Sequence, residues 1–187
     1  MEYGRKHGLP YSIIRPTGVY GPRAVYGGGQ MLMEPAGMNP VAIPANFDTH
    51  VPLIHVRDVA KAALFLAERP ETNGEIFNVN DDTIITMVEF MEFIAESTGH
   101  KFFKLPPVPV QLMRGVMMQV ARMMQFASRY TGMAPKLEAD TVAYLGNEFL
   151  YSNQKLKDTG FAFLYPDARE GIRETLEWYK HEGWIDY

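Results

Sequence analysis

Short apolar runs alternate with longer amphipathic segments along this chain, which is the pattern of an α/β protein. Residues 11–15 and 75–79 are brief apolar runs bounded by turn-forming residues, and they predict two strands of one parallel sheet. Residues 41–44 and 52–56 are two further runs joined by a polar turn, which predicts two strands that pair with each other. A last run at 148–151 predicts a short final strand.

Two of the helical segments carry clear boundary signals. Asp58 stands in the N-cap position of a helix predicted over 59–68, and this buried cap is favoured over a catalytic role. Thr86 is the expected N-cap of a helix over 87–98, which Gly99 ends. A shorter helical segment over residues 2–7 ends in the same way at Gly8, and another over 30–34 follows three consecutive glycines that predict either a hinge or a surface loop.

Residues 110–127 form the most unusual helical segment. Its apolar positions recur at spacings of three and four, and methionines give the seam an adaptable shape: Val110, Met113, Met117, Val120, Met124 and Ala127. Internal arginines argue against a membrane span. The segment predicts a helix packed on its own domain, a lid over an apolar substrate, a seam with a partner helix, or a membrane-surface element with Arg114, Arg122 and Arg129 toward lipid headgroups.

The rest of the chain is organised around residues 12–22, where an apolar run stops at a proline and opens into a loop. Pro16 and Pro22 fix their own φ angles, whereas Gly18 and Gly21 permit a backbone geometry or a close ligand approach that a side chain would forbid. A buried strand that delivers such a rigid loop predicts a binding site.

Composition narrows the function without identifying it. The chain has 187 residues, 47% hydrophobic and 21% charged, with a net charge of −4, so a nucleic-acid-binding role based on a basic patch is disfavoured. There is no cysteine for a disulfide or a thiolate metal site, and the five histidines show no metal-ligand spacing, so we expect no metal. No signal segment is seen, and we expect a cytoplasmic location.

Several residues suggest catalysis, yet each has a simpler interpretation. His55 lies within an apolar run and is expected to be a core or pocket-edge histidine. Asp81 and Asp82 are adjacent, so their side chains point apart, and we interpret them as turn formers. Tyr151 and Lys155 form the one Tyr-x-x-x-Lys pair in the chain, but the residues between them signal a helix start that leaves Tyr151 outside. We therefore assign no catalytic residue.

Several motifs occur together in a recognisable order. They are His7–Pro16 followed by Val19–Pro22, then residues 52–60, 74–79, 151–155 through 160–161, and a last helix over 170–179. This series resembles the extended short-chain dehydrogenases/reductases, the NAD-dependent epimerase/dehydratase family. The resemblance implies an α/β fold with a partial doubly wound, Rossmann-like parallel sheet and a small α+β substrate-binding domain. Residues 1–24 and 51–99 would belong to the nucleotide-binding sheet, and 25–50 and 100–187 to the substrate-binding domain.

The same resemblance implies a site for NAD or NADP and a small-molecule substrate. The family's loop lies beside the nicotinamide, which makes Pro16, Thr17, Gly18 and Val19 the expected cofactor contacts. The expected substrate contacts are Tyr20, Arg23, Tyr26 and Gln30. The family's reactions are epimerisation, dehydration and oxidation or reduction of hydroxyl and keto groups. The sequence before residue 51 lacks the Gly-rich turn and arginine usual in nucleotide-sugar enzymes, which favours an apolar alcohol or ketone.

Two family features are missing from the sequence. No glycine fingerprint for the pyrophosphate follows a first strand, and Tyr3 has no lysine four residues later. We therefore expect the C-terminal, substrate-binding half of such an enzyme, inactive alone and with weak or no binding of NAD. An exposed sheet edge further predicts a homo-oligomer or pairing with a separate N-terminal half. The alternatives are one subunit of a split enzyme and a non-catalytic interaction or membrane-surface module.

Overall fold

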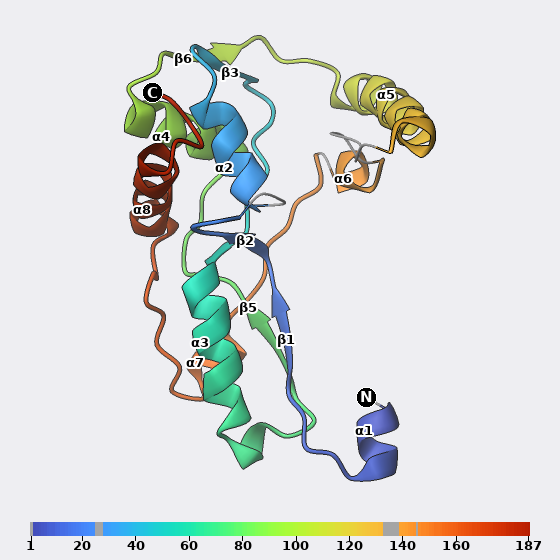
Figure 1. The fold of residues 1–187 in the computed structure, drawn as a ribbon, viewed down its shortest axis with the longest axis vertical. Helices are drawn as coiled ribbons and strands as arrows, with labels where there is room; N and C mark the ends of the chain where they lie inside the picture. Colours follow the sequence, from blue (N-terminus) through green and yellow to red (C-terminus); the bar gives the residue numbers. More distant parts are fainter. Residues whose placement is uncertain (1, 25–27, 133–138, 145) are drawn as a thin grey trace.

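The computed structural model describes residues 2–24, 28–132, 139–144 and 146–187 (Figure 1). Its strands are β1 (Ile13–Pro16), β2 (Gly18–Tyr20), β3 (Val41–Pro44), β4 (Leu53–His55), β5 (Ile76–Val79) and β6 (Phe102–Leu105). Its α-helices are α1 (Glu2–His7), α2 (Gly28–Ala36), α3 (Val56–Ala67), α4 (Met87–Thr98), α5 (Val110–Thr131), α6 (Ala139–Tyr144), α7 (Gln154–Lys157) and α8 (Ala168–His181), with a 3₁₀ turn at Pro70–Thr72. The protein is therefore α/β, as the sequence predicts.

The strands pair two by two, and every pair is parallel. β1 pairs with β5, which confirms the predicted pairing of those two runs. β2 pairs with β4, and β3 pairs with β6. The predicted pairing of 41–44 with 52–56 is therefore wrong, because each of these strands finds its partner elsewhere in the chain. Residues 148–151, all of them described, form no strand.

β1 and β2 are nearly one strand that changes partner at Thr17. Thr17 is the first residue after β1, and its amide donates to the carbonyl oxygen of Val79, the last residue of β5, at 3.2 Å. The amide of Gly18 donates to the carbonyl oxygen of Pro52, just before β4, at 3.0 Å. Within two residues the chain changes from pairing with β5 to pairing with β4, and the backbone amides of both residues keep hydrogen-bond acceptors.

The helix boundaries show one prediction confirmed and one corrected. α4 begins at a capping box in which Thr86 and Glu89 bond reciprocally, and it ends at Gly99 with a φ of 71°. α3 begins three residues earlier than predicted, and its N-cap is His55, whose Nδ1 accepts from the amide of Arg57 at 3.2 Å. Asp58 is therefore inside the first turn and is not the cap.

Two apolar clusters hold these elements together. The first joins β2, α2, α4 and α8 and is built on buried side chains such as Leu32, Phe90, Ile94, Ile172 and Leu176. The second lies under the β1–β5 pair and α3, where Leu66, Phe77 and Leu156 are buried. Full burial of one such side chain is worth about 1.5–3 kcal/mol, so both clusters fix the loop that runs between them.

α2 begins in the glycine segment for which the sequence predicts either a hinge or a surface loop. Gly28 and Gly29 are its first residues, and a Cβ on Gly29 would collide with the backbone of Ala24. Gly29 therefore serves helix packing, and because Gly28 and Gly29 both lie in α2, neither forms the predicted hinge or surface loop. Gly27 lies outside the described residues.

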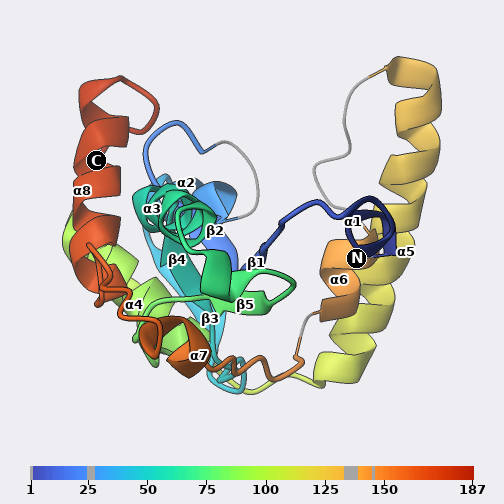
Figure 2. The same cartoon turned by 90° about the horizontal axis from the view of Figure 1, so that it is seen from below.

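α5 extends the predicted helix 110–127 by one turn and lies at one side of the molecule with α6 (Figures 1 and 2). All of its 22 residues are described, and Ala121 alone is buried. Four residues of the predicted seam, Val110, Met113, Met117 and Met124, are half-buried, whereas Val120 and Ala127 are exposed. Across the described ranges, no helix combines the length and apolar character that a bilayer-spanning segment needs.

Candidate functional site

The loop that follows β1 is fixed by backbone contacts on both sides. Pro16 is exposed at the end of β1, whereas Thr17, Gly18 and Val19 are half-buried. A Cβ at Gly18 would lie 2.9 Å from the carbonyl oxygen of Pro52, so only glycine lets the chain approach β4 this closely. The hydroxyl of Thr17 is buried and has no hydrogen-bond partner among the described residues.

α8 holds the far end of this loop through two tyrosines. Tyr20 is fully buried and donates its hydroxyl to the carbonyl oxygen of Ala168 at 3.2 Å. Tyr179 is also buried, and its hydroxyl lies 3.0 Å from the carbonyl oxygen of Gly21 and 2.9 Å from that of Ala24. Burial raises the pKa of Tyr20, and it raises the pKa of Tyr179 to about 12. Both hydroxyls therefore remain protonated donors.

His55 is enclosed between Tyr20 and Tyr165. Its ring centroid lies 5.3 Å from that of Tyr20 and 4.0 Å from that of Tyr165. Its Nδ1 accepts a hydrogen bond, so the proton of the neutral ring is on Nε2, which is buried and unpaired within the described structure. Burial lowers the pKa of His55. The histidine is thus a neutral core residue, one of the two roles expected from the sequence.

Asp58 ties α3 to the loop before α8. It is fully buried, and its two carboxylate oxygens accept from the amides of Leu164 at 2.6 Å and Tyr165 at 2.9 Å. This bond to two backbone donors more than 100 positions away has no signal in the local sequence. Asp58 therefore has a structural role, as expected. It acts as the acceptor for two amides of the loop before α8 and not as the predicted N-cap.

A cavity of about 200 Å³ opens beside the loop. It is formed where the segment before β4, the segment after β5 and the segment before α7 meet. Its lining residues are His50, Val51, Pro52, Leu53, Asn80, Asp81, Asp82, Thr83, Ile84, Phe149, Leu150, Tyr151 and Asn153. Because Thr17 and Gly18 bond to Val79 and Pro52, the loop and the cavity share a wall.

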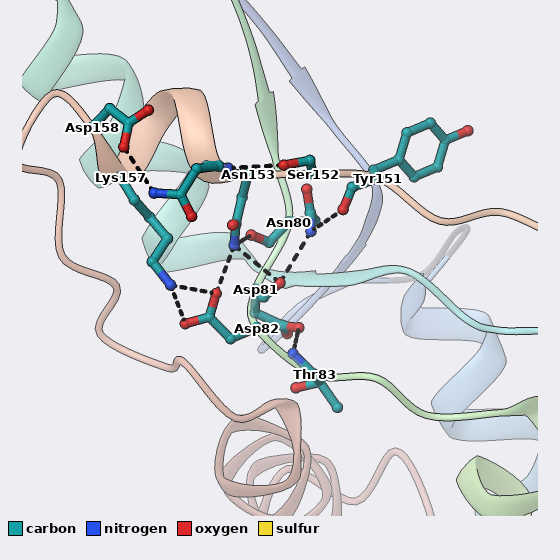
Figure 3. A network of polar contacts seen from close by, with 10 residues as sticks. Asn80, Asp81, Asp82, Thr83, Tyr151, Ser152, Asn153, Lys157 and Asp158 are labelled. Carbon is teal, nitrogen blue, oxygen red and sulfur yellow. Dashed lines mark hydrogen bonds and ion pairs between the residues drawn. The ribbon is translucent and has the colours of Figure 1, made fainter.

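A polar network joins two of these segments (Figure 3). The amide nitrogen Nδ2 of Asn153 donates to the carbonyl oxygen of Asn80 at 2.9 Å and to Oδ1 of Asp82 at 2.8 Å. Lys157 Nζ lies 2.9 Å from Oδ2 of Asp82, and Asn80 Nδ2 donates to the carbonyl oxygen of Tyr151 at 3.1 Å. The network fixes the chain before α7 against the end of β5.

Asp81 and Asp82 have opposite environments, as expected of adjacent residues. Partial burial acts to raise the pKa of Asp82, but hydrogen bonds from Asn153 and Lys157 hold it below its usual value. Asp81 is buried, and its Oδ1 accepts from the amide of Thr83 at 2.9 Å. Burial raises the pKa of Asp81 to about 7, although the bonds from Thr83 oppose the shift.

Two acceptors at the cavity lack donors. They are Oδ2 of Asp81 and Oδ1 of Asn80, both buried and without a partner in the part of the chain that the structure describes. An unpaired buried acceptor costs free energy of about 1–3 kcal/mol. A ligand or water that donates hydrogen bonds would remove this cost. The same ranges contain no group of three histidine, aspartate or glutamate side chains placed to hold a metal ion.

The predicted substrate contacts do not gather at this cavity. Tyr20 belongs to the core, so it supports the loop from inside and does not line a substrate pocket. Arg23 is exposed and has a φ of 69°, a left-handed conformation that is uncommon without glycine. Gln30 Nε2 donates to Oε1 of Glu34 at 2.7 Å. Tyr26 lies outside the described residues.

The cavity itself was missed, although one signal was available. The polar residues Asn80 and Asp81 come directly after the strand 75–79, and the carboxyl ends of parallel strands are where α/β proteins bind ligands. The pattern of residues 148–151 predicts a strand and gives no sign that they line a cavity. Tyr151 precedes α7 as expected, while Lys155 Nζ bonds to Oε2 of Glu75 at 2.6 Å.

Comparison with known families finds a match to the first part of the chain. Residues 1–80 match the family model described as the NAD dependent epimerase/dehydratase family. The resemblance to these short-chain dehydrogenases/reductases is thus found over those residues, and the family binds NAD or NADP. Dihydroflavonol 4-reductase of Hordeum vulgare is 32% identical over 99 residues, which are 49% of this chain and 27% of that protein.

Solved structures show the same fold. The protein gox2253 superposes with a TM-score of 0.66 at 23% identity, covering 99% of this chain and 53% of that one. The enzyme WbmF of Bordetella bronchiseptica, solved with NADH, gives 0.64 at 20% identity, with coverages of 97% and 48%. UDP-glucose 4-epimerase of Thermotoga maritima, solved with UDP-glucose, gives 0.61 at 19%, with coverages of 97% and 49%. The chain therefore spans about half the length of these structures and has a Rossmann-like α/β fold.

These comparisons correct one prediction. The chain was expected to be the C-terminal, substrate-binding portion of such an enzyme, but the family match falls on residues 1–80. That segment contains β1, β2, β3, β4 and β5, and the match places it in the Rossmann-like part of the family's fold. The prediction rests on two absences from the sequence, of a glycine fingerprint and of a lysine four residues after Tyr3. Each absence shows only that the sequence lacks one feature of the family, and neither assigns the chain to substrate binding.

Proposed function

We propose that this chain forms the nicotinamide side of an NAD(P) site in an extended short-chain dehydrogenase/reductase, with the neighbouring cavity contributing to substrate binding. The match of residues 1–80 to the NAD dependent epimerase/dehydratase family is the premise. The proposal assigns to these residues binding and orientation of cofactor and substrate, and it assigns no proton-transfer residue.

One observation carries the proposal: the loop at Thr17 lies at the carboxyl end of the β1–β5 pair, where the chain changes partner. In open α/β sheets, ligands bind outside the carboxyl ends of the strands. The loop is held there by the bonds of Thr17 to Val79 and of Gly18 to Pro52. A backbone fixed in this way can border a planar ring without rearranging.

Each loop residue has a proposed role toward the cofactor. Gly18 lets the backbone lie close to β4, because a Cβ there would meet the carbonyl oxygen of Pro52. Val19 is half-buried against the second apolar cluster and would offer a fixed apolar surface to the nicotinamide ring. Pro16 is exposed and rigid, and Thr17 offers a hydroxyl that lacks a partner in the described ranges. Either NAD or NADP would satisfy these contacts, because the proposal assigns them to the nicotinamide end, which the two cofactors share.

The residues that line the cavity favour a neutral substrate that has hydroxyl donors and an apolar framework. Asp81 and Asn80 supply acceptors, and Ile84, Leu150 and Tyr151 supply apolar surface. No lysine or arginine lines the cavity among the described residues, and a diphosphate would meet the carboxylate of Asp82 instead. The relative named dihydroflavonol 4-reductase supports a reductase acting on such a compound.

The remaining assignments follow the sequence. We propose that the β3–β6 pair and α2 belong to a small substrate-binding unit over residues 25–50 and 100–187. Arg23 remains a proposed substrate contact, since a strained exposed residue often marks a functional position. Gln30 remains one as well, provided that its bond to Glu34 opens when the substrate binds.

Cofactor binding can be tested on the chain by saturation-transfer NMR, which detects weak ligands. We expect transfer to the nicotinamide protons of nicotinamide mononucleotide and little transfer to adenosine monophosphate. Gly18→Ala places a Cβ against the Pro52 carbonyl and should remove the signal, whereas Gly37→Ala, whose Cβ would make an ordinary 3.6 Å contact, should keep it. Equal signals from both nucleotides, or no effect of Gly18→Ala, would contradict the proposal.

Substrate class can be tested in the same experiment. A dihydroflavonol should show transfer that Asp81→Ala weakens, because the variant lacks the unpaired acceptor. UDP-glucose should show none, because its diphosphate would face carboxylates. Transfer to UDP-glucose alone would overturn the assignment of a neutral substrate.

A further inference from the structure

An apolar stripe runs along the outer face of α5. Its members share one side of the helix, at successive spacings of four, four, three, three and four residues. They are Leu112, Val116, Val120, Met123, Phe126 and Tyr130, which are 67%, 58%, 44%, 71%, 59% and 78% exposed. This stripe differs from the seam predicted from the sequence, most of which faces inward and is half-buried.

The position of α5 leaves this stripe accessible. α5 packs against α6, and both lie apart from α2, α3, α4 and α8 (Figures 1 and 2). Ala121, on the side opposite the stripe, is the buried residue of the helix. The apolar side chains are therefore presented on a long, rigid and continuous edge of the molecule.

The charges on α5 indicate the chemistry of its partner. The helix carries Arg114, Arg122 and Arg129 and has no aspartate or glutamate, although the whole chain has a net charge of −4. Arg122 and Arg129 are exposed and seven residues apart, so they lie on one face, about 100° around the helix from the stripe. An apolar stripe with cations along one flank is complementary to a surface that is apolar inside and anionic outside.

We propose that α5 binds in the plane of an anionic membrane surface, with the stripe at the boundary of headgroups and acyl chains and with Arg122 and Arg129 at lipid phosphates. A second copy of the chain fits this face less well, because stripe-to-stripe pairing would bring the same arginines together with no carboxylate on either helix. This placement brings the cavity-bearing protein to apolar compounds dissolved in a membrane, but it does not depend on the proposed function.

Co-sedimentation with lipid vesicles tests the proposal. The chain should sediment with vesicles of phosphatidylcholine and phosphatidylserine, but not with phosphatidylcholine alone, and high salt should weaken the binding. Leu112→Glu/Phe126→Glu and Arg122→Glu/Arg129→Glu should each reduce binding by at least about tenfold. The matched control is Leu64→Glu/Lys101→Glu, which changes an exposed leucine on α3 and an exposed lysine outside α5 and should bind as the unaltered chain does.

The outcomes separate the possible partners. Circular dichroism should show unchanged helix content in all variants, since the substituted side chains are exposed. No sedimentation with anionic vesicles, or equal sedimentation of the variants and the unaltered chain, would overturn the proposal. Dimerisation in solution that Leu112→Glu/Phe126→Glu abolishes, without vesicle binding, would also overturn it and assign the stripe to a second copy.

Discussion

Tyr179 places its hydroxyl 3.0 Å from the carbonyl oxygen of Gly21, and this contact joins the last helix to the loop after β2. Tyr179 lies 158 positions from Gly21, so the proposed cofactor loop depends on the other end of the chain for its shape. The same hydroxyl lies 2.9 Å from the carbonyl oxygen of Ala24. α8 is therefore a support of the loop as well as a part of the core.

Tyr179→Phe should lower the free energy of unfolding by about 1–2 kcal/mol, because it leaves buried carbonyl oxygens without their donor. Urea denaturation followed by circular dichroism measures the change. Tyr130→Phe removes a hydroxyl from a largely exposed ring and should change stability by less than about 0.5 kcal/mol. Equal small effects of the two substitutions would show that the contact does not hold the loop.

Asp58→Ala should be among the most destabilising substitutions, at about 2–4 kcal/mol. It removes the buried acceptor of the Leu164 and Tyr165 amides and opens a cavity under α3. Asp58→Asn keeps one acceptor oxygen and should cost less. Denaturant midpoints of both variants give the comparison, and an alanine variant as stable as the asparagine variant would refute the account of this carboxylate.

Gly171→Ala should destabilise α8 although alanine is the better helix former. A Cβ at Gly171 would lie 2.5 Å from the Tyr20 hydroxyl and 3.1 Å from His55 Cδ2, so the tyrosine and histidine would have to move. Gly115→Ala in α5 meets nothing within 4 Å and should instead raise stability by roughly 0.5–1 kcal/mol. Thermal unfolding of the pair should therefore give shifts of opposite sign. Two shifts of the same sign would mean that α8 does not pack tightly on Tyr20.

Asp81 should make stability depend on pH between about pH 4 and pH 7. Its pKa rises from 3.8 to about 7 on folding, so the native state binds the proton more tightly than the unfolded state does. The carboxyl therefore favours the folded state at low pH, and this contribution is lost as pH rises through 7. Asp81→Asn removes this titration, so the variant should not show the loss between about pH 4 and pH 7. At about pH 7 and above it should be more stable than the unaltered protein, by on the order of 2 kcal/mol.

The control for this prediction is Asp186→Asn, at an exposed carboxylate near the end of the chain. It should keep the loss of stability between about pH 4 and about pH 7 that the unaltered protein shows. Denaturant unfolding at both pH values measures the difference. If the stability of Asp81→Asn had the same pH dependence as that of the unaltered protein, a group other than Asp81 would be responsible for it.

Local signals in the sequence predicted those elements whose contacts are local. Thr86 and Gly99 bound α4 as predicted, because a capping box and a left-handed C-cap involve residues three or four apart. The β1–β5 pair was also found, since both runs are apolar and bounded by turn residues. Gly8 ends α1 with a φ of 63° for the same local reason.

Contacts between distant segments were not predictable in this way. Nothing in 41–44 or 52–56 specifies that they pair with β6 and β2, because strand pairing is decided by packing over the whole chain. Asp58 has the local pattern of a helix cap, but its acceptors are used by Leu164 and Tyr165. The cavity likewise combines three segments, and only its position after β5 had a sequence signal.

The most direct test of the proposed cofactor site is a titration of the isotopically labelled chain with NADH and NADPH, followed through backbone amide chemical shifts. We predict that the largest shifts occur at Thr17, Gly18 and Val19, with smaller shifts at Asn80, and that nicotinamide mononucleotide reproduces them. Weak affinity is expected, because the sequence has no glycine fingerprint for the pyrophosphate. Shifts confined to residues away from this loop, or no shifts at millimolar cofactor, would contradict the account.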